Sequence, residues 1–118
     1  MCVLEKNVEV EGVEFHRYDA ERFMLRSNRS IFLVREPDNR HDPNLIKVIG
    51  KSKNRFLKAR KCIGYVPADI SNRIVKAGVE KKVQAQLREA VIGDRRHIRI
   101  NFDLLGPKDV YDKYRSTS

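Results

Sequence analysis

The clearest structural signal in this chain of 118 residues is the stretch Ile98-Arg99-Ile100-Asn101-Phe102-Asp103-Leu104. Apolar and polar side chains alternate along it, which is the two-residue period of a β-strand with one buried face. A second alternation at residues 83–88 favours a partner strand over a helix. Gly93-Asp94 lies between the two segments and is typical of a tight turn. The C-terminal half of the chain therefore predicts an antiparallel β-hairpin.

Further β-rich segments precede this hairpin. Apolar or β-branched runs predict strands at residues 30–34, 45–49 and 62–66. An N-terminal strand is expected to run through Val8, Val10, Val13 and Phe15, and Gly12 within it predicts a bulge or a sharp bend. On an alternating strand an aromatic side chain is more often buried than exposed, so we expect Phe15 to be a core residue, and Tyr65 as well.

Two helices are predicted between the strands. Ala20, Phe23 and Met24 share one helical face, and a longer helix begins at Pro67 and ends at Gly78. About six short strands with one or two helices indicate a mainly β (α+β) fold, a small β-barrel with a helix closing one end. The chain is expected to be one domain over residues 1–106, followed by a polar C-terminal tail at 107–118.

The charge of the chain is unevenly distributed. Lys and Arg number 25 and Asp and Glu 16, a net charge of +9. Residues 51–118 hold seventeen basic and seven acidic residues, so this part of the chain carries the whole excess of positive charge. Such asymmetry favours a polyanionic partner, with nucleic acid the first choice. No apolar run has the length of a membrane span, and two lone cysteines do not form a disulfide framework, so we expect a cytoplasmic protein without a membrane partner.

Three motifs follow one another in a specific order. They are Gly12-Val13-Glu14-Phe15, the turn-rich Arg35-Glu36-Pro37-Asp38-Asn39-Arg40-His41-Asp42-Pro43-Asn44-Leu45-Ile46-Lys47-Val48, and Ile63-Gly64-Tyr65-Val66-Pro67. This set resembles the HIRAN domain family, whose members occur at the front of DNA-remodelling helicases and as stand-alone bacterial and phage proteins. The resemblance runs from about Val8 to Gly106. It implies a modified OB-like β-barrel with helical additions, and it implies DNA binding.

The resemblance also implies a binding site. In a helicase-associated member of the family, an aromatic residue and an Asn/Asp-rich turn hold the 3′ end of single-stranded DNA. These positions correspond here to Phe15, Asp38, Asn39, His41 and Asp42. Cations of that member are replaced by Glu14 and Ala68, so we expect weak discrimination of a free 3′ hydroxyl. The same turn also has a purely structural interpretation, because Asp and Asn side chains bond to nearby backbone groups.

Basic residues cluster in one predicted loop at residues 51–61. The cluster consists of Lys51, Lys53, Arg55, Lys58, Arg60 and Lys61, with Phe56 and Leu57 among them. Basic residues around an aromatic suit a loop that follows a nucleic-acid strand, although charge can also protect an exposed sheet edge. Arg95, Arg96, His97 and Arg99 form a second patch, in which His97 and Arg99 are expected to share one strand face.

The sequence favours a binding module over an enzyme. The histidines are scattered, no glycine-rich phosphate loop is present, and the cysteines lack metal-ligand spacing, so no catalytic residue, metal or cofactor is expected. The main hypothesis is that the domain binds single-stranded DNA or strand ends and places a repair or remodelling enzyme, such as a helicase or nuclease, on DNA. The alternatives are a protein-interaction adaptor with a decayed DNA pocket and, less favoured, a small metal-dependent nuclease using Asp38, His41 and Asp42. The oligomeric state is left open.

Overall fold

The computed structural model describes residues 1–53 and 58–117, with Lys53 and Lys58 described by their backbone alone. Within these residues the strands are β1 Cys2–Glu9, β2 Ser30–Arg35, β3 Ile46–Lys53, β4 Lys58–Tyr65, β5 Gln84–Ile92 and β6 Ile98–Gly106. They form two antiparallel three-stranded sheets, with the strand orders β1-β6-β5 and β2-β3-β4. The predicted hairpin of 83–104 is confirmed as β5–β6, because the two strands pair antiparallel from Gln84–Leu105 to Ile92–Ile98. The expected single buried face of β6 is not confirmed, since Asn101 and Asp103 are buried as well as the apolar residues beside them.

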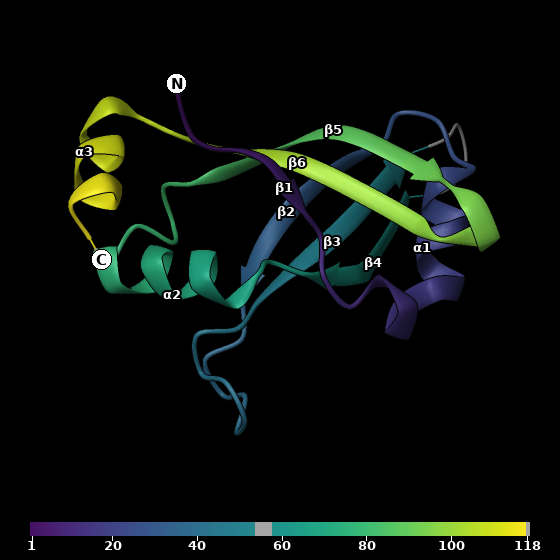
Figure 1. Ribbon diagram of the computed structural model, residues 1–118, viewed down its shortest axis with the longest axis horizontal. Coiled ribbons are helices and arrows are strands. Elements are labelled where there is room, and N and C mark those ends of the chain that lie inside the picture. The colour runs from purple at the N-terminus through teal and green to yellow at the C-terminus, as the bar shows by residue number, and fades with distance from the viewer. Residues whose placement is uncertain (54–57, 118) are drawn as a thin grey trace.

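Helices lie at both ends of the two sheets (Figure 1). They are α1 Arg17–Met24, α2 Ala68–Ala77 and α3 Lys108–Ser116, with the short 3₁₀ helices η1 Val13–His16 and η2 Asp94–Arg96. The first two α-helices are those predicted from the sequence, and Gly78 ends α2 in a left-handed conformation (φ 69°), as expected of a C-terminal glycine. None of the described helices is long and apolar enough to span a membrane.

Both sheets contribute to one hydrophobic core. Leu4 and Phe102 from one sheet, and Val48 and Ile63 from the other, are completely buried. The sheets do not close into a barrel, so the expected OB-like barrel is not confirmed. Within the described residues one isolated bridge, from Glu11 just beyond β1 to Tyr65 at the end of β4, joins the two sheets. The bridge is short because the chain leaves the extended conformation immediately afterwards, at Gly12 (φ 72°).

This turn also corrects the predicted N-terminal strand. β1 ends at Glu9, and Val13 and Phe15 lie in η1 instead of continuing the strand. The bend expected at Gly12 is present, and it is sharp enough to start a helix. Left-handed backbone is inexpensive for glycine alone, so one residue redirects the segment that carries Phe15.

The C-terminal segment is a helix, which corrects the expected polar tail. Val110 and Tyr114 are four residues apart, share one face of α3 and are completely buried. The hydroxyl of Tyr114 donates a hydrogen bond to Glu5 Oε1 at 2.8 Å, and burial raises the pKa of this tyrosine. The charged residues of the segment occupy the exposed face, which explains why its composition resembles that of a solvated tail.

The basic loop predicted at 51–61 is largely a continuation of two strands. Lys51 pairs with Arg60 and Ser52 with Ala59, so β3 and β4 extend into the segment. Arg55, with Phe56 and Leu57, lies outside the described residues.

Candidate functional site

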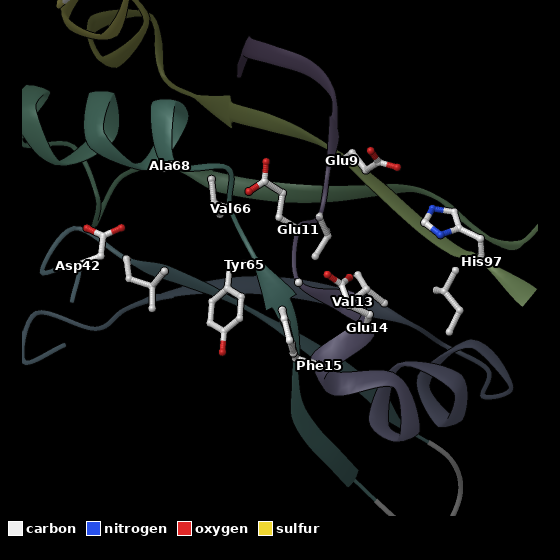
Figure 2. Close-up of a pocket in the computed structure, with 14 residues that line it drawn as sticks. Glu9, Glu11, Val13, Glu14, Phe15, Asp42, Tyr65, Val66, Ala68 and His97 are labelled. Atoms are coloured by element: carbon white, nitrogen blue, oxygen red, sulfur yellow. The ribbon is translucent and has the colours of Figure 1, made fainter. Parts of the chain in front are cut away.

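A cleft of about 540 Å³ opens where four segments of the chain meet. The segments are the end of β1 with η1 (9–15), the turn before β3 (42–45), the end of β4 with the start of α2 (65–68), and the start of β6 (97–98). We call this cavity the Phe15 cleft; Figure 2 shows the side chains that line it. The Glu11–Tyr65 bridge holds the first and third segments together through backbone hydrogen bonds of 2.8 and 2.9 Å.

Phe15 is the most exposed of the phenylalanines in the described residues, with 81% of its surface accessible. The expectation that it belongs to the core is therefore wrong. Its ring lies beside the cleft because η1 turns it out of the strand direction (Figure 2). An exposed aromatic face beside a cavity is a stacking surface for a planar group such as a nucleobase.

Tyr65 forms the second aromatic wall and is only half-buried, so its expected core position is not confirmed. Its ring lies so close to Gly12 that a Cβ atom at that position would come within 2.9 Å of Tyr65 Cδ2. Tyr65 Oη is 2.9 Å from Nε2 of His16, and the two rings meet edge to face. Burial raises the pKa of the Tyr65 hydroxyl, which remains protonated at neutral pH. His16 is therefore a positioning residue for this wall.

Gly64 is the point where β4 passes closest to the end of β1. Its φ is 156°, and a Cβ atom there would lie 2.4 Å from Val10 Cγ1 and 2.6 Å from the carbonyl oxygen of Glu11. Only glycine fits this contact without displacing the backbone. The Gly-Tyr pair of the third sequence motif thus builds the cleft: Gly64 permits the approach, and Tyr65 supplies the bridge and the wall.

The rim of the Phe15 cleft is acidic. Glu9, Glu11, Glu14 and Asp42 all line it, against a single histidine, His97. Neither lysine nor arginine occurs among its described lining residues. Ala68, the first residue of α2, lines the cleft at the N-terminal end of this helix. Glu14 and Ala68 were expected here from the sequence, whereas Glu9 and Glu11 were missed. The acidic residues around Gly12 could have indicated Glu9 and Glu11 from the sequence, but only the fold shows that they line the same cavity.

The Asn/Asp-rich turn is built by its own side chains. Asn39 Oδ1 accepts hydrogen bonds from the backbone N–H groups of His41 and Asp42, both at 2.9 Å. Asp42 Oδ1 accepts one from the N–H of Asn44 at 3.0 Å. Of the four turn residues predicted to bind DNA, Asp42 alone lines the cleft. Asp38 and His41 are exposed outside it, and Asn39 is occupied within the turn, which supports the structural interpretation of these positions.

The predicted basic residues lie elsewhere. Lys51, Arg60 and Lys61 belong to the outer part of the β3–β4 hairpin and do not line the Phe15 cleft. Arg99 is exposed on β6 and is paired with Glu89 at 3.4 Å. His97, its expected neighbour on the same exposed side, does reach the cleft. The structure thus separates an acidic, aromatic cleft from the basic hairpin that the sequence analysis assigned to the same interface.

The Cys62 thiol and the possible metal ligands of the chain bear on whether this site could be catalytic. Burial raises the pKa of the Cys62 thiol, whose Sγ donates to the carbonyl oxygen of Gly64, and a protonated thiol is a poor nucleophile. In the described part of the chain no three His, Cys, Asp or Glu side chains are grouped so that they could hold a metal ion.

The fold and the cleft define a class of protein, a small two-sheet β domain with an aromatic cleft at one edge. The model of the HIRAN domain family matches residues 6–109. The chain therefore belongs to the HIRAN family, whose model covers nearly the whole of the sequence, and the HIRAN domain is a DNA-binding type of domain. Comparisons with curated proteins and with solved structures gave no match.

Proposed function

We propose that this protein binds single-stranded DNA, preferentially near a strand end, with a base stacked on Phe15 at the mouth of the Phe15 cleft. The observation that carries this proposal is the exposed Phe15 ring beside a cavity. An exposed aromatic face beside a cavity can stack a base, a contact that contributes about 1–3 kcal/mol. Family membership and the net charge of +9 support DNA as the ligand.

The acidic rim determines which part of the DNA enters the cleft. Carboxylates accept hydrogen bonds from sugar hydroxyls and from the amino groups of bases, and they repel phosphates. Asp42 and Glu14 therefore suit the sugar or base of a terminal nucleotide, while its phosphates remain outside. The absence of a cation among the described lining residues implies modest affinity, since phosphate contacts dominate the binding of nucleic acid.

We further propose that the domain works inside the cell as a recruiting module without a catalytic step of its own. It would bring a partner such as a helicase or nuclease to exposed single strands. The raised pKa of the Cys62 thiol, which keeps this potential nucleophile protonated, supports this proposal.

Fluorescence anisotropy with labelled oligonucleotides across a salt series tests the proposal. We expect the logarithm of the binding constant to fall linearly with the logarithm of salt concentration, by about 0.7 for each phosphate neutralised. With Mg²⁺ or Mn²⁺ added, the DNA is expected to remain intact. Failure to bind at physiological salt would favour the protein-interaction adaptor, and cleavage lost in Asp42→Ala would favour the nuclease.

A further inference from the structure

We propose that a second cavity, between α1 and the β3–β4 hairpin, is the site that holds the phosphate backbone of the bound strand. This inference rests on the proposed function and adds the part of the interface that the acidic cleft lacks. The cavity has a volume of about 270 Å³. We call it the arginine groove and define it by its lining residues, which are Tyr18, Asp19, Arg22, Phe23, Arg26, Gly50, Ser52, Ala59 and Lys61.

Three cations converge on the arginine groove from two elements. Arg22 lies on α1, Arg26 just beyond its end, and Lys61 on β4. Asp19 is the one carboxylate among the described lining residues, so the groove has a net charge of +2. This is the opposite sign to the Phe15 cleft, and phosphate is therefore favoured in the groove and disfavoured in the cleft.

The pairing of these three cations differs from that of other arginines in the described part of the chain. Within the described residues none of the three forms an ion pair, whereas Arg17, Arg96 and Arg99 are all paired with glutamates. The guanidinium of Arg22 instead lies over the ring of Tyr18, 5.5 Å from its centre. Nη1 of Arg22 also donates a hydrogen bond to Tyr18 Oη at 3.4 Å, and its other N–H groups are not used by an ion pair. Arginines without an acidic partner around a concavity remain able to bind phosphate.

The floor of the groove leaves room for a backbone. Gly50, Ser52 and Ala59 face α1 from the paired strands β3 and β4, and all three side chains are small or absent. Gly50 is required there, because a Cβ atom would come within 2.8 Å of the Phe23 ring. The volume is slightly below the range of roughly 300–1,000 Å³ usual for small-molecule pockets, which suits a phosphate group with part of a sugar.

Exposed aromatics connect the groove to the Phe15 cleft. Tyr18 is 71% exposed and follows Phe15 by three residues. Their Cα atoms are therefore at most about 11 Å apart, a distance that a short single strand covers. A positively charged groove with successive aromatic platforms is the arrangement that binds single strands without sequence preference. The strand would place its end at Phe15 and its preceding phosphates in the arginine groove.

The double variant Arg22→Ala/Arg26→Ala tests the inference against a matched control. The control, Lys113→Ala/Arg115→Ala, removes the same number of positive charges, both of them exposed on α3, and Arg115 lies over Tyr111 as Arg22 lies over Tyr18. It lies on α3, at the opposite end of the molecule (Figure 1). Lys61→Ala tests the other wall of the groove independently.

Binding is measured for a linear oligonucleotide and for a circular single strand of the same composition. The groove double variant is expected to reduce the salt slope by about 1.4, and Lys61→Ala by about half as much, on both DNAs. Between about 50 and 200 mM salt the wild-type protein would then lose about sevenfold more affinity than the double variant. The control should retain the wild-type slope.

Two outcomes would overturn the inference. If the wild-type protein binds DNA and its slope is unchanged in both groove variants, the groove is not the backbone site, although the proposed function stands. If the control reduces the slope as much as the groove variant, the effect belongs to net charge alone. Loss of binding to the linear strand only would mean that the groove serves the end instead of the backbone.

Discussion

Replacing Phe15 by alanine is expected to weaken the binding of a linear single strand by roughly 5- to 150-fold, because stacking on an aromatic contributes about 1–3 kcal/mol per base. The thermal midpoint should be nearly unchanged, since the ring is 81% exposed and supports little of the core. Anisotropy titrations and thermal unfolding of the same preparations measure the two effects. Phe15→Trp should retain the affinity, because the stacking face is preserved.

Ile92→Ala is the control for this experiment. Ile92 is also an exposed apolar residue, at 50%, and it lies on β5; it lines neither cavity, although its partner on β6, Ile98, lines the Phe15 cleft. A comparable loss in this variant, or full affinity in Phe15→Ala, would remove Phe15 from the interface.

Glu14→Arg tests the same site by a change that is expected to raise the affinity for DNA instead of lowering it. A cation in place of the rim carboxylate should tighten binding to the linear strand more than to a circular one, and equal gains would show that the cleft does not distinguish an end.

Replacing Gly64 by alanine should have the largest effect on stability, a loss of about 3–5 kcal/mol in the free energy of unfolding. The added methyl group would meet Val10 and the carbonyl oxygen of Glu11 at distances far below van der Waals contact, and φ is positive. The total free energy of unfolding of a small domain is only about 5–15 kcal/mol. A fall of about 12–20 °C in the thermal midpoint is expected, with equilibrium urea unfolding giving the free energy directly.

Gly78→Ala separates the effect of the close contact from that of backbone conformation. Gly78 also has a positive φ, 69°, but a Cβ atom there would meet nothing within 4 Å. Its replacement should cost only about 1–2 kcal/mol. Equal losses in the two variants would contradict the close approach of β4 to β1, and with it the geometry of the Phe15 cleft.

The elements predicted correctly are those whose signal is local. The alternation of β5 and β6 and the Pro67 start and Gly78 end of α2 each lie within a few residues of the structure they specify. The three ordered motifs likewise identified the HIRAN family without coordinates. Two local patterns were interpreted wrongly. Phe15 was expected in a strand, but the left-handed backbone at Gly12 ends the extended segment before it. Residues 107–118 were expected to be a polar tail because of their composition, but Val110 and Tyr114, four residues apart, give α3 a buried face.

The two cavities follow from tertiary contacts that local patterns do not specify. Asp42 lines the same cleft as Glu11 and Glu14. It precedes β3, which pairs with β4, and the Glu11–Tyr65 bridge holds β4 against the end of β1. Arg26 and Lys61 are far apart in the chain and share a groove only because α1 packs on β3 and β4. The total charge of +9 could be read from composition, but its separation into an acidic cleft and a basic groove could not. Electrostatic potential depends on distances between charges, and folding sets those distances.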